Sequence, residues 1–124
     1  MGFLDGLMGN ASEVDQDKVE KELAGLLIDG EDFQTGYKII RDLFIFTNKR
    51  LLLIDKQGMS GKKVDYHSIP YKSITHFSVE TAGSFDLDSE LKIWISGTSV
   101  PIEKTFKKDS PVNEVQRTLA KYVL

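Results

Sequence analysis

One apolar stretch near the middle of the chain constrains the fold more than any other feature. Residues 43–55 read LFIFTNKRLLLID, so two apolar runs flank a short polar turn. A strand with one solvent-facing side would alternate apolar and polar residues, and these runs do not. Both faces of the predicted hairpin must therefore be covered, because an exposed apolar hairpin promotes aggregation. The cover can be an N-terminal helix of the same chain, a second subunit or a membrane.

Short strands joined by tight turns are predicted on both sides of this hairpin. Turn residues separate the apolar segments: Pro70 ends one strand and Gly97 marks the last turn. Short antiparallel strands of this kind favour a barrel or an orthogonal sandwich. The seven predicted strands cover residues 36–41, 43–47, 51–56, 63–69, 73–81, 91–96 and 99–106.

An amphipathic helix is predicted at each end of the strand region. Residues 13–28 repeat apolar side chains at helical spacing, with Ser12 as the N-cap and Gly30 as a stop signal. The second helix is predicted to have Ser110 as its cap and Pro111 at its first position. Its apolar stripe needs a surface to cover, so we expect it to close one corner of the barrel. The two stripes comprise Val19, Leu23, Leu26 and Leu27 in the first helix, and Val112, Val115, Leu119, Tyr122 and Val123 in the second.

The length and charge of the chain limit its function. With 124 residues it is expected to form a single domain over residues 13–124, after a flexible segment at residues 1–12. Residues 1–36 carry 9 acidic and 2 basic side chains, and residues 37–124 carry 10 acidic and 14 basic ones, which gives a net charge of −3. An acidic front and a mildly basic body argue against nucleic acid as a partner. They allow the front of one chain to meet the body of another.

The absence of cysteine and of long apolar runs limits the cellular location that the sequence predicts. Without cysteine the chain forms neither disulfides nor zinc–thiolate sites, which fits a cytoplasmic protein. No stretch approaches the ~20 apolar residues that cross a bilayer. Met1–Met8 contain Asp5 and no leading basic cluster, so no signal peptide is predicted. Gly6 stands where an N-myristoylation motif has Ser or Thr, so no myristoyl group is predicted either.

Several segments spread over nearly the whole chain match one known family. They are MGFLDGL at 1–7, RD at 41–42, FTNKRL at 46–51, IPYKSI at 69–74, ETAG at 80–83 and ELKIWI at 90–95. Together these segments resemble the bacterial pleckstrin-homology domain family. The resemblance implies a pleckstrin-homology-like barrel of two near-orthogonal sheets with a C-terminal capping helix. It also implies ring-shaped homo-oligomers, and it brings no agreed ligand.

The link between the first two predicted strands argues against inheriting a lipid ligand from that fold. Eukaryotic pleckstrin-homology domains that bind phosphoinositides use a long basic loop at this place. Here the predicted link is the tight turn Arg41-Asp42, which carries one charge of each sign. A headgroup pocket needs several converging cations, and this turn alone does not supply them. Phosphoinositide binding therefore does not follow from the fold.

No residue pattern indicates catalysis, a metal or a cofactor. His67 and His76 lack thiols or paired carboxylates at metal-ligand spacing, and no nucleophile elbow occurs. The run at 58–63 has the wrong spacing for a phosphate loop and leads into a strand. Asp86, Asp88 and Glu90 alternate, so a weak cation site or ordinary solvated acids are both possible interpretations. We predict a protein that is not an enzyme and has no cofactor or resident metal.

The remaining hypothesis is a non-catalytic scaffold that self-assembles and binds an unidentified protein partner. The alternative is a peripheral membrane or anionic-lipid binding domain, which the net charge of −3 disfavours. A third hypothesis, a small-molecule pocket inside the barrel, is disfavoured because Leu, Ile and Phe side chains suffice to fill it. The predicted interface residues are Phe44, Phe46, Leu52, Ile54 and Trp94, and the predicted contacts to an anionic partner are Lys49, Arg50, Lys62 and Lys63.

Overall fold

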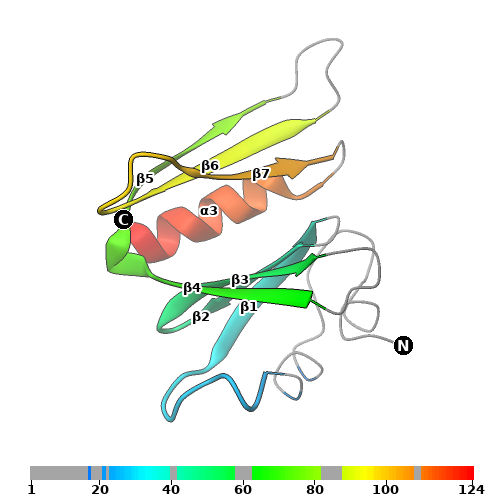
Figure 1. Ribbon diagram of the computed structural model, residues 1–124, viewed down its shortest axis with the longest axis vertical. Helices are drawn as coiled ribbons and strands as arrows, with labels where there is room; N and C mark the ends of the chain where they lie inside the picture. The colour runs from blue at the N-terminus through cyan, green and yellow to red at the C-terminus, as the bar shows by residue number, and fades with distance from the viewer. Residues whose placement is uncertain are drawn as a thin grey trace. The chain divides into compact units, whose positions relative to one another are not determined.

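The computed structural model contains two compact units, residues 1–69 and 70–124. It describes residues 17, 21, 23–39, 42–57, 63–81, 88–107 and 110–124. Within these residues, the first unit holds a four-stranded antiparallel sheet, and the second holds a three-stranded antiparallel sheet and the C-terminal helix (Figure 1). The predicted segment at 1–12 and the cap Ser12 lie outside the described residues.

The first unit is a meander in which each strand pairs with the next one along the chain. Its sheet has the order β1-β2-β3-β4. Ile45 in β2 lies opposite Gly36 in β1 and Leu52 in β3. Neighbours in sequence are neighbours in the sheet because each connection is short. The strands are β1 (Phe33–Ile39), β2 (Asp42–Thr47), β3 (Arg50–Gln57) and β4 (Lys63–Pro70).

The β2–β3 hairpin is buried on both faces, as its sequence predicted. Residues 43–46 and 51–54 are only 0–3% exposed. On one face Leu43, Ile45, Leu52 and Ile54 form a cluster with Leu23 and Phe33, against which Leu27 and Val64 also pack. The cover of this face is therefore the chain's own segment before β1, which was the first of the three expected covers.

The covering segment does not have the predicted conformation. Residues 23–30 form successive turns rather than the end of a helix over 13–28. The amide of Ile28 donates to the Glu31 carboxylate at 3.1 Å instead of to a carbonyl one turn earlier. Gly25 and Gly30 add to this, because glycine is a poor helix former. Before Leu23 the structure describes only Asp17 and Lys21, so the predicted helix is not supported.

The second unit joins a three-stranded sheet to a helix. The sheet has the order β5-β6-β7, and α3 runs alongside it and contacts β5 and η1 (Figure 1). Tyr71 stacks on Tyr122 with ring centroids 4.9 Å apart, which ties η1 to the end of α3. The elements are η1 (Tyr71–Ser73), β5 (Ile74–Glu80), β6 (Ser89–Ile95), β7 (Ile102–Phe106) and α3 (Val112–Val123).

The C-terminal helix is confirmed, but its start differs from the prediction. Val115 and Leu119 of the predicted stripe are fully buried. Pro111, not Ser110, is the N-cap, and no side chain caps the helix. With ψ of 53° Pro111 is outside the helical range, so the chain enters the helix one residue later than predicted. The Ser110 carbonyl accepts from the amide of Val112 at 2.9 Å.

The predicted sheets are present, but they do not close into a barrel by strand pairing. Among the described strands, β4 pairs within the first sheet and β5 within the second. The chain leaves β4 at Pro70 and passes through the 3-10 turn η1 before β5 begins. Proline has no amide to donate to a ladder, so the sheet is interrupted at this point. The first strand also begins earlier than predicted, at Phe33, and the last begins later, at Ile102.

Candidate functional site

A buried carboxylate organises the turn between β2 and β3. Glu31 accepts from Arg50 twice, with Nε 2.8 Å from Oε2 and Nη2 2.9 Å from Oε1. Thr47 Oγ1 donates to Oε2 at 2.7 Å, and the Ile28 amide donates to Oε1 at 3.1 Å. Four donors thus compensate the loss of water around this carboxylate. We call Glu31, Thr47, Asn48 and Arg50 the turn cluster.

Thr47 and Asn48 shape the turn and fasten the preceding segment to it. The Thr47 hydroxyl oxygen accepts the amides of Lys49 and Arg50, each at 3.0 Å, so it fixes the turn from within. Asn48 Oδ1 accepts the amide of Asp32 at 2.7 Å, and its Nδ2 donates to the Gly30 carbonyl at 2.9 Å. The segment before β1 is therefore bound to the turn by side-chain bonds in addition to its apolar contacts.

The guanidinium of Arg50 forms its hydrogen bonds with groups of its own chain. Besides Glu31, its guanidinium donates to the Leu26 carbonyl at 2.7 Å and to Ser68 Oγ at 2.8 Å. Its five donor hydrogens form a rigid fork that suits one bidentate acceptor and two further ones. The structure therefore places this predicted contact for an anionic partner in an internal ion pair.

The charge of Glu31 is favoured by its surroundings. Burial alone would raise the pKa of this carboxyl above its ordinary value of 4.5. Hydrogen bonds from Arg50, Thr47 and the Ile28 amide, together with the positive charge of Arg50, outweigh burial and hold the pKa below that value. The ion pair is therefore charged at neutral pH, and it loses its negative partner only in acid.

The second feature lies on one face of the β5–β6–β7 sheet. His76 lies opposite Trp94, and the two rings stack with centroids 4.4 Å apart and an interplanar angle of 17°. The hydroxyl of Thr75 lies 3.0 Å from His76 Nδ1 and donates to the Trp94 carbonyl at 3.2 Å. The side chains on this face of the sheet are exposed or half-buried, and we call it the open face. By the register, its residues are His76, Ser78, Glu80, Glu90, Lys92, Trp94, Glu103 and Thr105.

The predicted interface residues occupy different environments. Phe44, Phe46, Leu52 and Ile54 are 0–1% exposed, so they lie inside the chain and not on its surface. The Phe46 ring packs edge-on against Tyr37, with centroids 6.3 Å apart. Trp94 is half-buried on the open face, and the neighbouring Ile93 is buried on the other face, as alternation predicted.

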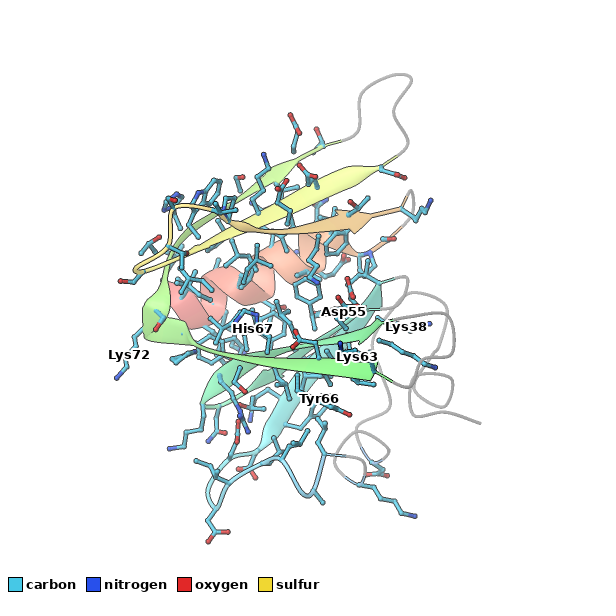
Figure 2. All side chains as sticks on the ribbon, in the orientation of Figure 1. Lys38, Asp55, Lys63, Tyr66, His67 and Lys72 are labelled. Atoms are coloured by element: carbon cyan, nitrogen blue, oxygen red, sulfur yellow. The ribbon has the colours of Figure 1, made fainter. Side chains whose placement is uncertain are left out.

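The predicted basic residues do not converge. Lys49 and Lys63 are exposed, but they lie near opposite ends of β3, in the turn before it and at the start of β4. A strand of this length spans roughly 25 Å, too far for both ammonium groups to meet one anionic group. Figure 2 shows Lys63 at the start of β4. Lys62 lies outside the described residues.

The remaining candidates for chemistry show no shared site. His67 is exposed on β4, on the opposite side of the strand from Tyr66 (Figure 2). Within the described part of the chain, no three His, Asp or Glu side chains gather as metal ligands. Asp86 and residues 58–62 lie outside that part.

The link between β1 and β2 is as short as predicted. Ile39 and Asp42 are partners in the sheet, so two residues link the strands, and Asp42 belongs to β2 instead of the turn. No helix among the described residues is long and apolar enough to cross a bilayer.

The sequence matches a known family over almost its full length. The profile described as "Bacterial PH domain" matches residues 2–123. This chain belongs to the bacterial PH domain family. The PH domain from Shewanella amazonensis is 61% identical, with a TM-score of 0.85 and 99% of each chain covered. A PH-domain protein from Shewanella loihica is 56% identical, with a TM-score of 0.80, covering 94% of this chain and all of that one.

Relatives in Bacillus subtilis are similar over most of their length. The uncharacterized protein YjqA is 58% identical over 121 residues, which is 97% of both chains. The uncharacterized protein YozO is 38% identical over 103 residues, covering 83% of this bacterial PH domain and 88% of YozO. These similarities establish the family and the PH-like fold.

Two parts of the site in this bacterial PH domain were not found from the sequence. Glu31 was counted only as one acid of the negative front, because nothing in the sequence shows that it faces Arg50 across 19 positions. Thr75 was not singled out, because its role depends on a register shift between Ile74 and His76. Thr47 and Asn48 stood within a segment that carried the family resemblance, but their bonds to Glu31 and Asp32 depend on the three-dimensional arrangement.

Proposed function

We propose that this bacterial PH domain is a non-catalytic interaction module that assembles into a ring-shaped homo-oligomer and binds a protein partner. The observation that carries the proposal is the exposure of three large apolar side chains on the first unit. Ile28 is 62% exposed, Tyr66 is 46% exposed and Leu26 is 39% exposed. We call these three residues the apolar patch, and we propose it as the contact with a second copy of the chain.

The hydrogen bonds of the turn cluster link the two segments that carry these three residues. Arg50 bonds both the Leu26 carbonyl and the Ser68 hydroxyl, so the segment before β1 is held against β4. Tyr66 and Ser68 share one face of β4, because side chains alternate along a strand. The amide of Ile28 is fixed by Glu31. A patch that is already ordered loses little entropy on binding, which favours association.

A role without catalysis is supported by how the polar side chains are used. The turn cluster uses its polar groups within the chain: Thr47 and Arg50 donate to Glu31, and Asn48 donates to the Gly30 carbonyl. A catalytic group needs access to a substrate, whereas Glu31 is buried beneath Arg50. PH-like folds are interaction modules in general, and the family membership supports the same role here.

Binding to an anionic membrane is the weaker alternative. It was suggested by the lysines, but Lys49 and Lys63 lie near opposite ends of β3 and Arg50 is paired with Glu31. An anionic headgroup is held by several cations that converge on it. Flotation with phosphatidylserine vesicles at low salt tests this alternative, and flotation that Lys63→Gln abolishes would support it over self-assembly.

The proposed assembly is tested by light scattering after size-exclusion chromatography. The wild-type chain of 14.0 kDa is expected to elute as a sharp multiple of that mass. Ile28→Glu places a charge in the apolar patch and should reduce the mass towards that of one chain. Val100→Glu is the matched control, because Val100 is an exposed apolar residue of the second unit. A monomeric wild type, or an unchanged mass for Ile28→Glu, would contradict the proposal.

A further inference from the structure

The stacked pair His76–Trp94 is held by a local irregularity of the sheet. Ile74 pairs with Ile95 and His76 with Trp94, so Thr75 is an extra residue in β5. Such a bulge re-aims a side chain, and here the Thr75 hydroxyl reaches both the Trp94 carbonyl and His76 Nδ1. We call Thr75, His76 and Trp94 the aromatic platform. The two rings are stacked, and His76 is exposed.

The Thr75 hydroxyl connects the two rings of the platform. It donates to the Trp94 carbonyl at 3.2 Å and lies 3.0 Å from His76 Nδ1, where the donor and acceptor roles follow the tautomer of the imidazole. The stacked rings offer an aromatic surface, which suits a planar cation.

The charges around the platform complement a cation. Glu103 lies opposite Lys92, and Trp94 is two residues from Lys92 on the same face. Diagonal neighbours of this kind lie about 7–8 Å apart, within the reach of one long side chain. Glu80 and Glu90 add negative charge along the same face. Among the described residues of the face, Lys92 is the single lysine or arginine, and its Nζ lies 3.7 Å from Glu90 Oε1. The open face is therefore net negative.

We propose that the aromatic platform and Glu103 bind an arginine side chain in an extended, basic segment of a partner protein. The guanidinium stacks on the platform and donates to Glu103, a combination that its planar fork allows and that a lysine ammonium does not reproduce. Further basic residues of the segment meet Glu80 and Glu90. This inference rests on the proposed role as an interaction module, but it does not depend on self-assembly.

The test uses the full chain and fluorescein-labelled peptides of alternating arginine and serine. At low salt the wild type should increase the anisotropy of the arginine peptide, and the emission of Trp94, the single tryptophan of the chain, should change with it. A lysine–serine peptide should bind roughly two- to fivefold more weakly, because stacking of the guanidinium is lost. A glutamate–serine peptide should not bind.

Three variants distinguish binding at the aromatic platform from nonspecific electrostatic attraction. Trp94→Leu should lower the affinity for the arginine peptide roughly two- to fivefold and abolish the preference for arginine over lysine. Glu103→Gln lies at an exposed position, so it should not disturb the fold. It should lower the affinity for the arginine peptide about twofold. Glu114→Gln on α3 changes the same charge away from this face and should leave binding unchanged.

Three results would overturn the inference. The first is equal affinity of wild type and Glu103→Gln for the arginine peptide. The second is no binding of that peptide by the wild type at low salt. The third is a change of oligomer mass in Trp94→Leu, which would make the platform a contact between copies. Light scattering on the same samples separates the two proposals: an intact oligomer without peptide discrimination overturns only this inference, and a monomer that discriminates overturns only self-assembly.

Discussion

The guanidinium of Arg50 holds the buried carboxylate of Glu31 with two nitrogens, at 2.8 and 2.9 Å. These residues stand 19 positions apart in the sequence. The Glu31 side chain is 1% exposed and that of Arg50 is 22% exposed, so the pair is largely screened from water. Such a pair adds little net stability compared with apolar residues, but breaking it leaves a buried charge without compensation. Its role is to fix the segment before β1 in one position on the β2–β3 turn.

Arg50→Met should therefore destabilise the chain. The substitution keeps an apolar stem but leaves Glu31 charged and without its bidentate partner, which costs about 2–4 kcal/mol of unfolding free energy. Urea unfolding followed by circular dichroism measures this change. Lys49→Met removes the neighbouring exposed cation and should change the unfolding free energy by less than about 0.5 kcal/mol. The double variant Glu31→Gln/Arg50→Met should recover part of the loss, and a double variant no more stable than Arg50→Met would contradict the explanation.

The stability of the chain should fall in acid through the titration of Glu31. Its folded pKa lies below the unfolded value of 4.5, so the unfolded state binds more protons between these two values. The stability from the charged carboxylate is fully present above pH 4.5 and is lost as the pH falls through the folded pKa. The difference in unfolding free energy between wild type and Glu31→Gln should therefore shrink as the pH is lowered. A difference that stays constant or widens in acid would be inconsistent with a lowered pKa.

More of the fold than of the candidate site could be predicted from the sequence. Two-sided burial of the β2–β3 hairpin followed from its lack of alternation, and burial of Leu43–Phe46 confirms it. Periodicity shows that an apolar face is covered but does not show which element covers it. For that reason Phe44 and Leu52 were predicted as interface residues although they are buried within the chain.

The two features of the candidate site depend on long-range geometry. The Glu31–Arg50 pair forms because the segment before β1 folds back on the hairpin in turns, whereas its apolar spacing predicted a helix. The aromatic platform depends on the extra residue Thr75 in β5, and a bulge has no fixed sequence signal. Short-range patterns do not contain this information, since partners distant in the sequence define it.

Asn48→Ala should loosen the segment before β1 without unfolding the sheet. The variant loses the side-chain bonds to the Asp32 amide and the Gly30 carbonyl, at about 1 kcal/mol each. Hydrogen exchange followed by mass spectrometry should show faster exchange of the amides in residues 26–32. Asn113→Ala, at an exposed position of α3, is the matched control and should leave the exchange in these residues unchanged. Unchanged exchange in Asn48→Ala would mean that the apolar contacts of Leu23 and Leu27 suffice to hold the segment.

The glycines offer a separate test of the backbone in both units. Gly30 has φ of 83° and Gly97 has φ of 90°, in the left-handed region that L side chains rarely adopt. An added Cβ would meet no atom within 4 Å at either position, so any cost of alanine comes from the backbone alone. Gly30→Ala and Gly97→Ala should each lower the unfolding free energy by about 1–2 kcal/mol. Gly25→Ala also meets open space but has no positive φ, so it should be neutral or stabilise the chain by up to about 1 kcal/mol. If Gly30→Ala unfolded like Gly25→Ala in urea, the turn that presents the Gly30 carbonyl to Asn48 would not need its left-handed conformation.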